Sequence, residues 1–266
     1  MRAAIPIQPT LAHPWNPDKT DPRGWFMSEK LDGVRCIYKD GMFFTRTGKT
    51  INAPKFFTKY LTKNKVILDG EIYGGYGNFD KTSGICRKKK AVAADWKTLT
   101  YQIFDVVDYR DCKACERQEI IKSVIGRSKY HKIVKQRICR GAADVAEFLK
   151  EVEARGGEGV MLRDTQAVYE FKRSHSLLKV KTFKDLDARV VEHKKGSGKY
   201  KRKLGAVVCE MSDGKRFKCG SGFTDAQRES PPSIGTLITV KYFELTKAKI
   251  PRFPSYVGVR AEQDLS

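Results

Sequence analysis

The sequence predicts an α+β fold in which antiparallel sheets with flanking helices are followed by an all-β domain. Three observations support this fold class. Apolar runs of strand length recur through most of the 266 residues. Apolar residues at helical spacing predict only two helices in the first part, at residues 116–125 and 143–154. Beyond about residues 183–187 the helical signals nearly stop, and short strands with glycine turns take over.

The first part begins with 24 proline-rich residues that predict an irregular arm. Strands at residues 25–38 and 42–46 flank Lys39-Asp40-Gly41, a hairpin signal because Asp-Gly tolerates the positive φ of a tight turn. Further strands are expected at residues 66–73, 100–107, 159–163 and 176–181.

The second part contains the predicted elements of a small antiparallel barrel. Five short strands and one short helix at residues 224–229 are the elements of an OB-fold. The strands are expected at residues 186–193, 204–211, 216–218, 234–245 and 256–260. We therefore predict two domains, residues 1–184 and 185–266.

Charge and composition restrict the function classes. The 52 basic and 31 acidic side chains give a net charge of +21, which favours a polyanionic partner, nucleic acid above all. No apolar stretch approaches a membrane span and residues 1–15 lack the apolar core of a secretory signal, so we expect an intracellular protein, cytoplasmic, or nuclear in a eukaryotic host. Seven cysteines without regular spacing argue against a disulfide framework.

One lysine is placed for nucleophilic chemistry. Lys30-Leu31-Asp32-Gly33-Val34-Arg35 ends one apolar strand and opens the next, so Lys30 is expected at a turn beside a sheet. A lysine attacks only as the neutral amine, which neighbouring cations or a metal favour. A solvated lysine at a turn accounts for this motif equally well when it is taken alone.

Acidic and basic pairs elsewhere strengthen the nucleophile hypothesis. Strand alternation places Asp69 and Glu71 on one face, and Glu158 begins another strand among glycines that would let a ligand approach closely. Carboxylates in this arrangement suit Mg²⁺, which takes one or two of them together with phosphate oxygens. Lys179 and Lys181 also share one strand face.

These motifs resemble those of the covalent nucleotidyltransferases, and within them the ATP-dependent DNA ligases of the minimal two-domain type. Their order and rough spacing match the family over about residues 25–183, which would form the adenylation (nucleotidyltransferase) domain. The set comprises residues 30–35, 43–48, 68–73, 101–105, 158–161 and 178–181. The end of the chain, around residues 243–260, is similar to the end of the family's OB domain.

The resemblance implies a role for each residue. Lys30 would attack the α-phosphate of ATP and form lysyl-AMP, assisted by Lys179 and Lys181. Glu71 would contact the ribose or Mg²⁺, and Glu158 would bind Mg²⁺. The remaining nucleotide contacts would be Arg35 and Arg46 to sugar and phosphates, Phe104 stacked on adenine, and Ser28 and Glu29 at the adenine edge.

The same resemblance implies nicked duplex DNA as the partner of a monomeric enzyme. Arg173 would help bind the 5′-phosphate of the nick. Only about 24 residues precede the adenylation motifs, so the grip on DNA must come from elsewhere. The basic run between two OB strands is the candidate, as a flexible loop that orders on phosphates. Its cations are Lys194, Lys195, Lys199, Lys201, Arg202 and Lys203.

Two positions and three alternative functions stay open. Arg252 and Arg260 are the nearest matches to a family signature that orients pyrophosphate. An RNA ligase or an mRNA guanylyltransferase would share the lysine chemistry. A non-catalytic nucleic-acid-binding protein would share the fold and the charge.

Overall fold

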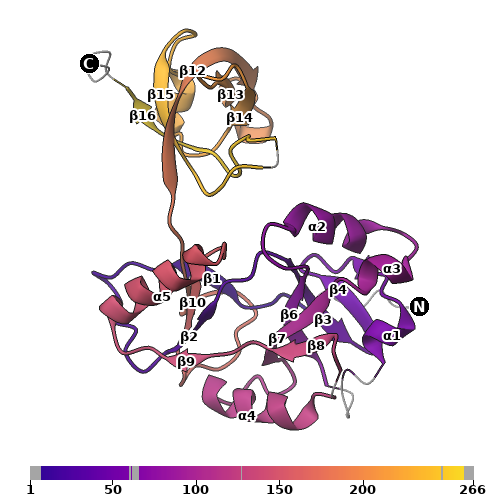
Figure 1. The fold of residues 1–266 in the computed structure, drawn as a ribbon. Coiled ribbons are helices and arrows are strands. Elements are labelled where there is room, and N and C mark those ends of the chain that lie inside the picture. Colours follow the sequence, from indigo (N-terminus) through magenta and orange to yellow (C-terminus); the bar gives the residue numbers. More distant parts are fainter. Residues whose placement is uncertain (1–6, 60, 62–65, 127, 247, 261–266) are drawn as a thin grey trace. The chain divides into compact units, whose positions relative to one another are not determined.

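The computed structural model describes residues 7–59, 61, 66–126, 128–246 and 248–260. The chain divides after Lys181 into two compact units, and each is described by itself (Figure 1). In the described part, no helix is both long and apolar enough to cross a bilayer.

Unit 1 contains two mixed sheets. Sheet A has the strand order β1-β11-β10-β2-β9, and sheet B has the order β5-β4-β3-β6-β7-β8. Sheet A is formed by β1 (Leu11–Pro14), β2 (Phe26–Glu29), β9 (Arg137–Ile138), β10 (Val160–Arg163) and β11 (Arg173–Val180). Sheet B is formed by β3 (Val34–Lys39), β4 (Met42–Thr45), β5 (Thr50–Ile51), β6 (Leu68–Tyr73), β7 (Thr100–Val106) and β8 (His131–Ile133).

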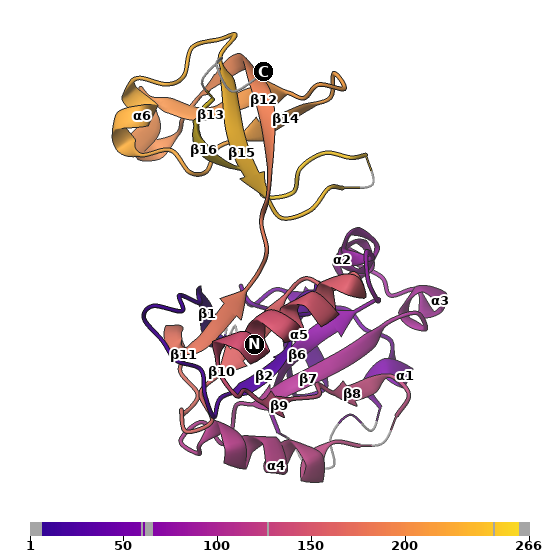
Figure 2. The same ribbon diagram turned by 60° about the vertical axis from the view of Figure 1, so that its left-hand side comes forward.

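The helices pack on these sheets. α5 (Ala142–Ala154) covers sheet A through Val145 and Val152, which contact Met27 and Leu162 in one apolar cluster (Figure 2). Sheet B buries the larger cluster, which includes Trp96, Tyr101 and side chains of four helices. These helices are α1 (Lys55–Thr58), α2 (Phe79–Arg87), α3 (Ala93–Trp96) and α4 (Ala114–Val124).

Unit 2 is a single antiparallel sheet with the order β14-β13-β12-β15-β16. Its elements are β12 (Lys184–Lys195), the 3₁₀ turn η1 (Gly198–Tyr200), β13 (Leu204–Glu210), β14 (Arg216–Cys219), α6 (Asp225–Glu229), β15 (Leu237–Tyr242) and β16 (Ser255–Val259). Thr224 caps α6, since its hydroxyl accepts a hydrogen bond from the backbone N–H of Gln227. The predicted five strands and short helix are all present.

The fold class is confirmed, with local corrections. Residues 11–14 were expected in an irregular arm but form β1, whose partner β11 lies about 160 residues further along the chain. β1 pairs with β11 and β7 with β8 in parallel, so the sheets are not purely antiparallel. Helices α1 and α3 have four residues each, too short for a periodic signal, and α2 carries Gly84 in its middle.

Candidate active site

Lys30 lies where the chain leaves one sheet and enters the other. β2 belongs to sheet A and β3 to sheet B, and Lys30 follows β2 directly. The backbone N–H of Lys30 donates to the carbonyl of Gly159, 2.8 Å away, at the start of β10. The connection is therefore tied to sheet A at the residue that carries the predicted nucleophile.

Gly159, which accepts this hydrogen bond, lets the neighbouring backbone approach closely. Gly159 has a φ of +148°, and a Cβ there would lie 2.2 Å from the carbonyl oxygen of Val180. Gly157 would meet Val152 in the same way, at 2.4 Å. Both glycines bring segments of unit 1 close together and so set the position of Glu158 between them.

Glu158 joins two of the predicted lysines. Its Oε2 accepts a hydrogen bond from Lys30 Nζ, and its Oε1 accepts one from Lys181 Nζ. The Glu158 side chain is 6% exposed, against 23% for Lys30 and 16% for Lys181. One nearly buried carboxylate thus lies between two ammonium groups that would otherwise repel each other, and it offsets part of their positive charge.

Lys179 and Lys181 lie in a desolvated, cationic environment. Burial lowers the pKa of Lys181, and the nearby charge of Lys30 adds to that effect while Glu158 opposes it. Burial also lowers the pKa of Lys179, followed by the repulsion of Lys181, Arg173 and Lys30. This local excess of positive charge is suited to an anionic ligand.

Sheet B supplies a second group of predicted residues. Arg35 donates to Asp69 through Nε (3.1 Å) and Nη2 (2.6 Å), and its guanidinium lies over the ring of Phe104 with 5.2 Å between Cζ and the centroid. Glu71 accepts a hydrogen bond from the backbone N–H of Gly33 at 3.2 Å. Arg35, Glu71 and Phe104 thus lie on neighbouring strands β3, β6 and β7.

Glu71 is the carboxyl with the most altered acidity. Desolvation raises its pKa to about 8, although Lys30 and Arg35 oppose the shift; the charges of Glu158 and Asp69 raise it further. Glu71 is therefore within electrostatic reach of both Lys30 and Glu158. It belongs to the same site even though its strand lies in the other sheet.

The site offers few side chains that could coordinate a metal ion. Among the described residues, no group of three His, Cys, Asp or Glu side chains is arranged to hold a metal ion. Glu71 and Glu158 remain as two carboxyl groups, and Glu71 would bind the ion only after losing its proton. Two are enough for Mg²⁺ when phosphate oxygens and water complete its shell, so these residues fit a metal that arrives with a nucleotide.

Other predicted residues of unit 1 lie on the same two sheets. Ser28 and Glu29 are in β2, and Glu29 accepts a hydrogen bond from the Tyr76 hydroxyl at 3.2 Å. Arg46 is exposed in the turn after β4. Arg173 begins β11, and its guanidinium donates to the carbonyl of Ala12 in β1.

The basic loop of unit 2 contacts α6 through ion pairs. Lys199 pairs with Asp225 at 3.4 Å, and Lys203 pairs with Glu229 at 2.5 Å. The Tyr200 hydroxyl donates to Asp225 at 2.9 Å. Of the other loop cations, Lys194 pairs with Glu192, whereas Lys195, Lys201 and Arg202 are exposed with no ion pair to the described part of the chain.

Arg252 and Arg260 also have partners inside unit 2. The guanidinium of Arg252 donates a hydrogen bond to the Glu244 carboxylate. Arg260 forms an ion pair with Asp187, with 3.5 Å between Nη1 and Oδ2. These contacts hold the two arginines against their own unit.

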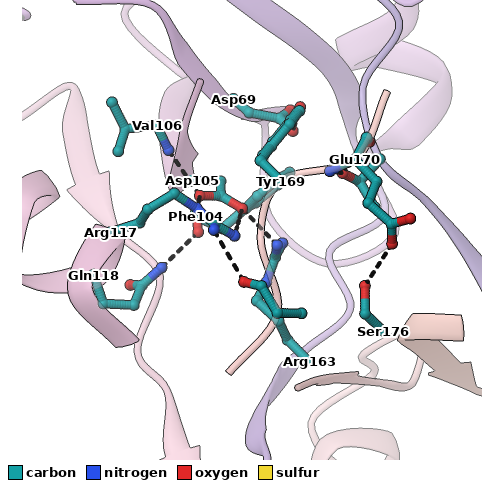
Figure 3. A network of polar contacts seen from close by, with 12 residues as sticks. Asp69, Phe104, Asp105, Val106, Arg117, Gln118, Arg163, Tyr169, Glu170 and Ser176 are labelled. Atoms are coloured by element: carbon teal, nitrogen blue, oxygen red, sulfur yellow. Dashed lines mark hydrogen bonds and ion pairs between the residues drawn. The ribbon is translucent and has the colours of Figure 1, made fainter. Parts of the chain in front are cut away.

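A buried polar network was missed by sequence reasoning. The carboxylate of Asp105 accepts hydrogen bonds from Arg117 Nε at 2.7 Å and Arg163 Nη1 at 2.5 Å (Figure 3). The Tyr169 hydroxyl donates to Asp69 at 2.7 Å. The only sequence signal was charged residues inside otherwise apolar segments, which does not identify their partners.

We predict that Glu158→Gln destabilises unit 1. The change leaves two crowded ammonium groups without a counter-charge, and we expect a loss of about 1–3 kcal/mol of unfolding free energy. All three tryptophans lie in unit 1, so their fluorescence during urea unfolding reports this unit. Lys181→Met in the Glu158→Gln background is expected to recover part of the loss.

A matched control is Glu119→Gln, which removes the carboxylate of an exposed pair with Lys122. Its expected change is within about 0.5 kcal/mol. Equal effects of the two substitutions would contradict a special role of the Glu158 carboxylate.

Sequence comparisons identify the family. Residues 9–181 match the family described as ATP dependent DNA ligase domain, and residues 195–260 match the DNA ligase OB-like domain. A DNA ligase of Haemophilus influenzae is 36% identical over 248 residues, which cover 92% of this chain and 90% of that protein. A DNA ligase of Thermococcus fumicolans is 27% identical, and the match covers 88% of this chain and 51% of that protein.

Solved structures agree with the sequence matches. A structure described as "DNA binding with a minimal scaffold: Structure-function analysis of Lig E DNA ligases" has a TM-score of 0.88 at 31% identity, covering 94% of this chain and 98% of that one. The adenylate of the Chlorella virus DNA ligase has a TM-score of 0.55 at 26% identity, covering 97% of this chain and 99% of that one. These likenesses confirm the nucleotidyltransferase and OB-like domains, and the chain belongs to the ATP-dependent DNA ligase family.

Proposed function

We propose that this protein is an ATP-dependent DNA ligase that seals nicks with a 5′-phosphate and a 3′-hydroxyl in duplex DNA. The observation that carries the proposal is the contact of Lys30 and Lys181 with the two oxygens of Glu158. DNA is favoured over RNA as the substrate because the relative at 36% identity is a DNA ligase. We assign lysine adenylation to residues 1–184 and DNA contact in part to residues 185–266.

The first step is the transfer of AMP to Lys30. Its neutral amine attacks the α-phosphorus of ATP, a P–N bond forms, the bond to the pyrophosphate oxygen breaks, and pyrophosphate leaves. Glu158 already accepts a hydrogen bond from Lys30 Nζ and is placed to take the proton. Lys181 and Lys179 stabilise the charge that develops on the phosphate.

Sheet B and the end of β2 would bind the nucleoside. Phe104 would stack on adenine, with Ser28 and Glu29 at its edge, and Arg35 and Arg46 would contact the ribose and phosphates. The geometry that supports this assignment is the guanidinium of Arg35 over the Phe104 ring at 5.2 Å. Phe104 is half-buried, so part of its ring is accessible for stacking on a base.

Mg²⁺ would be held by Glu71 and Glu158. When bound, it neutralises phosphate charge during the transfer. Both Glu158 oxygens face lysines in the free protein. Before the attack, the Lys30 proton would pass through Glu158 to solvent, which removes the charge of Lys30 and leaves Oε2 available to the metal.

The later steps pass AMP to DNA. The 5′-phosphate of the nick attacks lysyl-AMP and frees Lys30; the 3′-hydroxyl then attacks the adenylated 5′-phosphate, and AMP leaves as the strand is sealed. Arg173 would hold the 5′-phosphate. The exposed loop cations would contact the DNA backbone, and a monomeric, intracellular enzyme agrees with this substrate.

The adenylation step predicts a covalent adduct. Intact-protein mass should rise by one AMP after incubation with Mg²⁺ and ATP but not GTP, and Lys30→Ala should abolish the rise. Lys97→Ala, which removes an exposed lysine outside the site, is the control and should react like the wild type. Labelling by GTP would favour the guanylyltransferase, and no labelling of AMP-free protein would favour a non-catalytic nucleic-acid-binding protein.

The loop contacts predict a graded loss of DNA binding. Lys201→Ala with Arg202→Ala should weaken binding to a nicked duplex. The slope of the logarithm of the binding constant against the logarithm of the salt concentration should fall in magnitude by about 2, because each cation that contacts a phosphate contributes about 1 to that slope. Lys199→Ala with Lys203→Ala should have a smaller effect, because α6 carboxylates already neutralise these lysines. Lysine adenylation should stay normal in both variants; unchanged DNA binding would remove the loop from the mechanism.

A further inference from the structure

The buried network of unit 1 connects the two sheets that carry the site. Arg163 ends β10, the sheet A strand that begins two residues after Glu158, and it donates to Asp105 in β7 of sheet B. Asp105 and Arg117 are both 1% exposed as side chains. Their ion pair therefore lies in the interior, away from water. Hydrogen bonds between charged groups are strong there, so this pair holds both side chains in one arrangement.

Arg117 also fixes the segment that precedes Tyr169. Its Nη1 donates to the carbonyls of Cys112 at 2.6 Å and Ala167 at 3.1 Å, and its Cζ lies 5.7 Å from the centre of the Tyr169 ring. The Tyr169 backbone N–H donates to the carbonyl of Arg110 at 2.8 Å. These contacts leave little freedom for the tyrosine, which is 4% exposed.

Tyr169 ends the network at a residue of the nucleotide site. Its hydroxyl donates to Oδ2 of Asp69, the same oxygen that accepts from Arg35 Nη2 at 2.6 Å. On the other side of the network, Gln118 donates to the carbonyl of Phe104 at 2.7 Å (Figure 3). Gln118 of α4 thus restrains the backbone of Phe104, and Tyr169 restrains Arg35 through Asp69.

We propose that Tyr169 is a positioning residue for nucleotide binding, acting through Asp69 on Arg35. The inference rests on the proposed function. Asp69 is fully buried and accepts hydrogen bonds from both Arg35 and Tyr169. The tyrosine therefore fixes the orientation of the carboxylate to which the Arg35 guanidinium is hydrogen-bonded. Without the hydroxyl, Asp69 and Arg35 rotate more freely and the nucleotide must order them when it binds.

The test is the ATP dependence of Lys30 adenylation in Tyr169→Phe. We expect the half-saturating ATP concentration to rise about 3- to 10-fold, the scale of one lost hydrogen bond, with the rate at saturating ATP within about twofold of wild type. Tyr200→Phe is the matched control. It removes a tyrosine hydroxyl that also donates to a carboxylate, that of Asp225 in unit 2 at 2.9 Å, and its ATP dependence should equal that of the wild type.

Three results would overturn the inference while the wild type still forms lysyl-AMP. They are an unchanged ATP requirement in Tyr169→Phe, equal shifts in Tyr169→Phe and Tyr200→Phe, and a loss confined to the saturating rate. If Tyr169→Phe fails to fold, Arg117→Lys replaces it, because it keeps the charge beside Asp105 but removes the fork that holds Ala167. A wild-type protein that forms no adduct would instead reject the proposed function.

Discussion

The site depends on one carboxylate shared by two lysines. Glu158 contacts Lys30 and Lys181 at once, so it holds the proposed nucleophile and a proposed phosphate-binding lysine side by side despite their repulsion. The backbone around it is equally constrained, since Gly157 and Gly159 admit no larger side chain beside Val152 and Val180. A substrate phosphate can take over the role of this carboxylate, because it offers the lysines the same negative charge.

The second constraint is the alignment of two sheets. Lys30, Glu158 and Lys181 belong to sheet A or its ends, whereas Arg35, Glu71 and Phe104 belong to sheet B. The chain crosses between them at residues 30–33, and the ion pairs of Asp105 with Arg117 and Arg163 connect them again in the interior. A nucleotide that contacts both groups of residues, as we propose, would find them already held in place, and little ordering would be left for the moment of binding.

Much of this site could be predicted because its signals are local. The hairpin at Asp40-Gly41 has the positive φ values that the dipeptide favours, and helices α4 and α5 lie within two residues of their predicted bounds. Long-range partners could not be predicted. Leu11 pairs with Arg173, and Tyr169 reaches Asp69 across 100 residues, contacts that no short-range pattern encodes. The approach of Val180 to Gly159 could not be predicted either, because a sequence does not show which backbone segment will lie beside a glycine.

The central claim is that Lys30 carries AMP to the DNA and has no essential part in the last step. The most direct test gives Lys30→Ala two nicked duplexes, one with an ordinary 5′-phosphate plus ATP and one whose 5′-phosphate is already adenylated. We predict that the variant seals only the adenylated nick, while the wild type seals the ordinary nick as well. Sealing of the ordinary nick by Lys30→Ala with ATP would contradict the account.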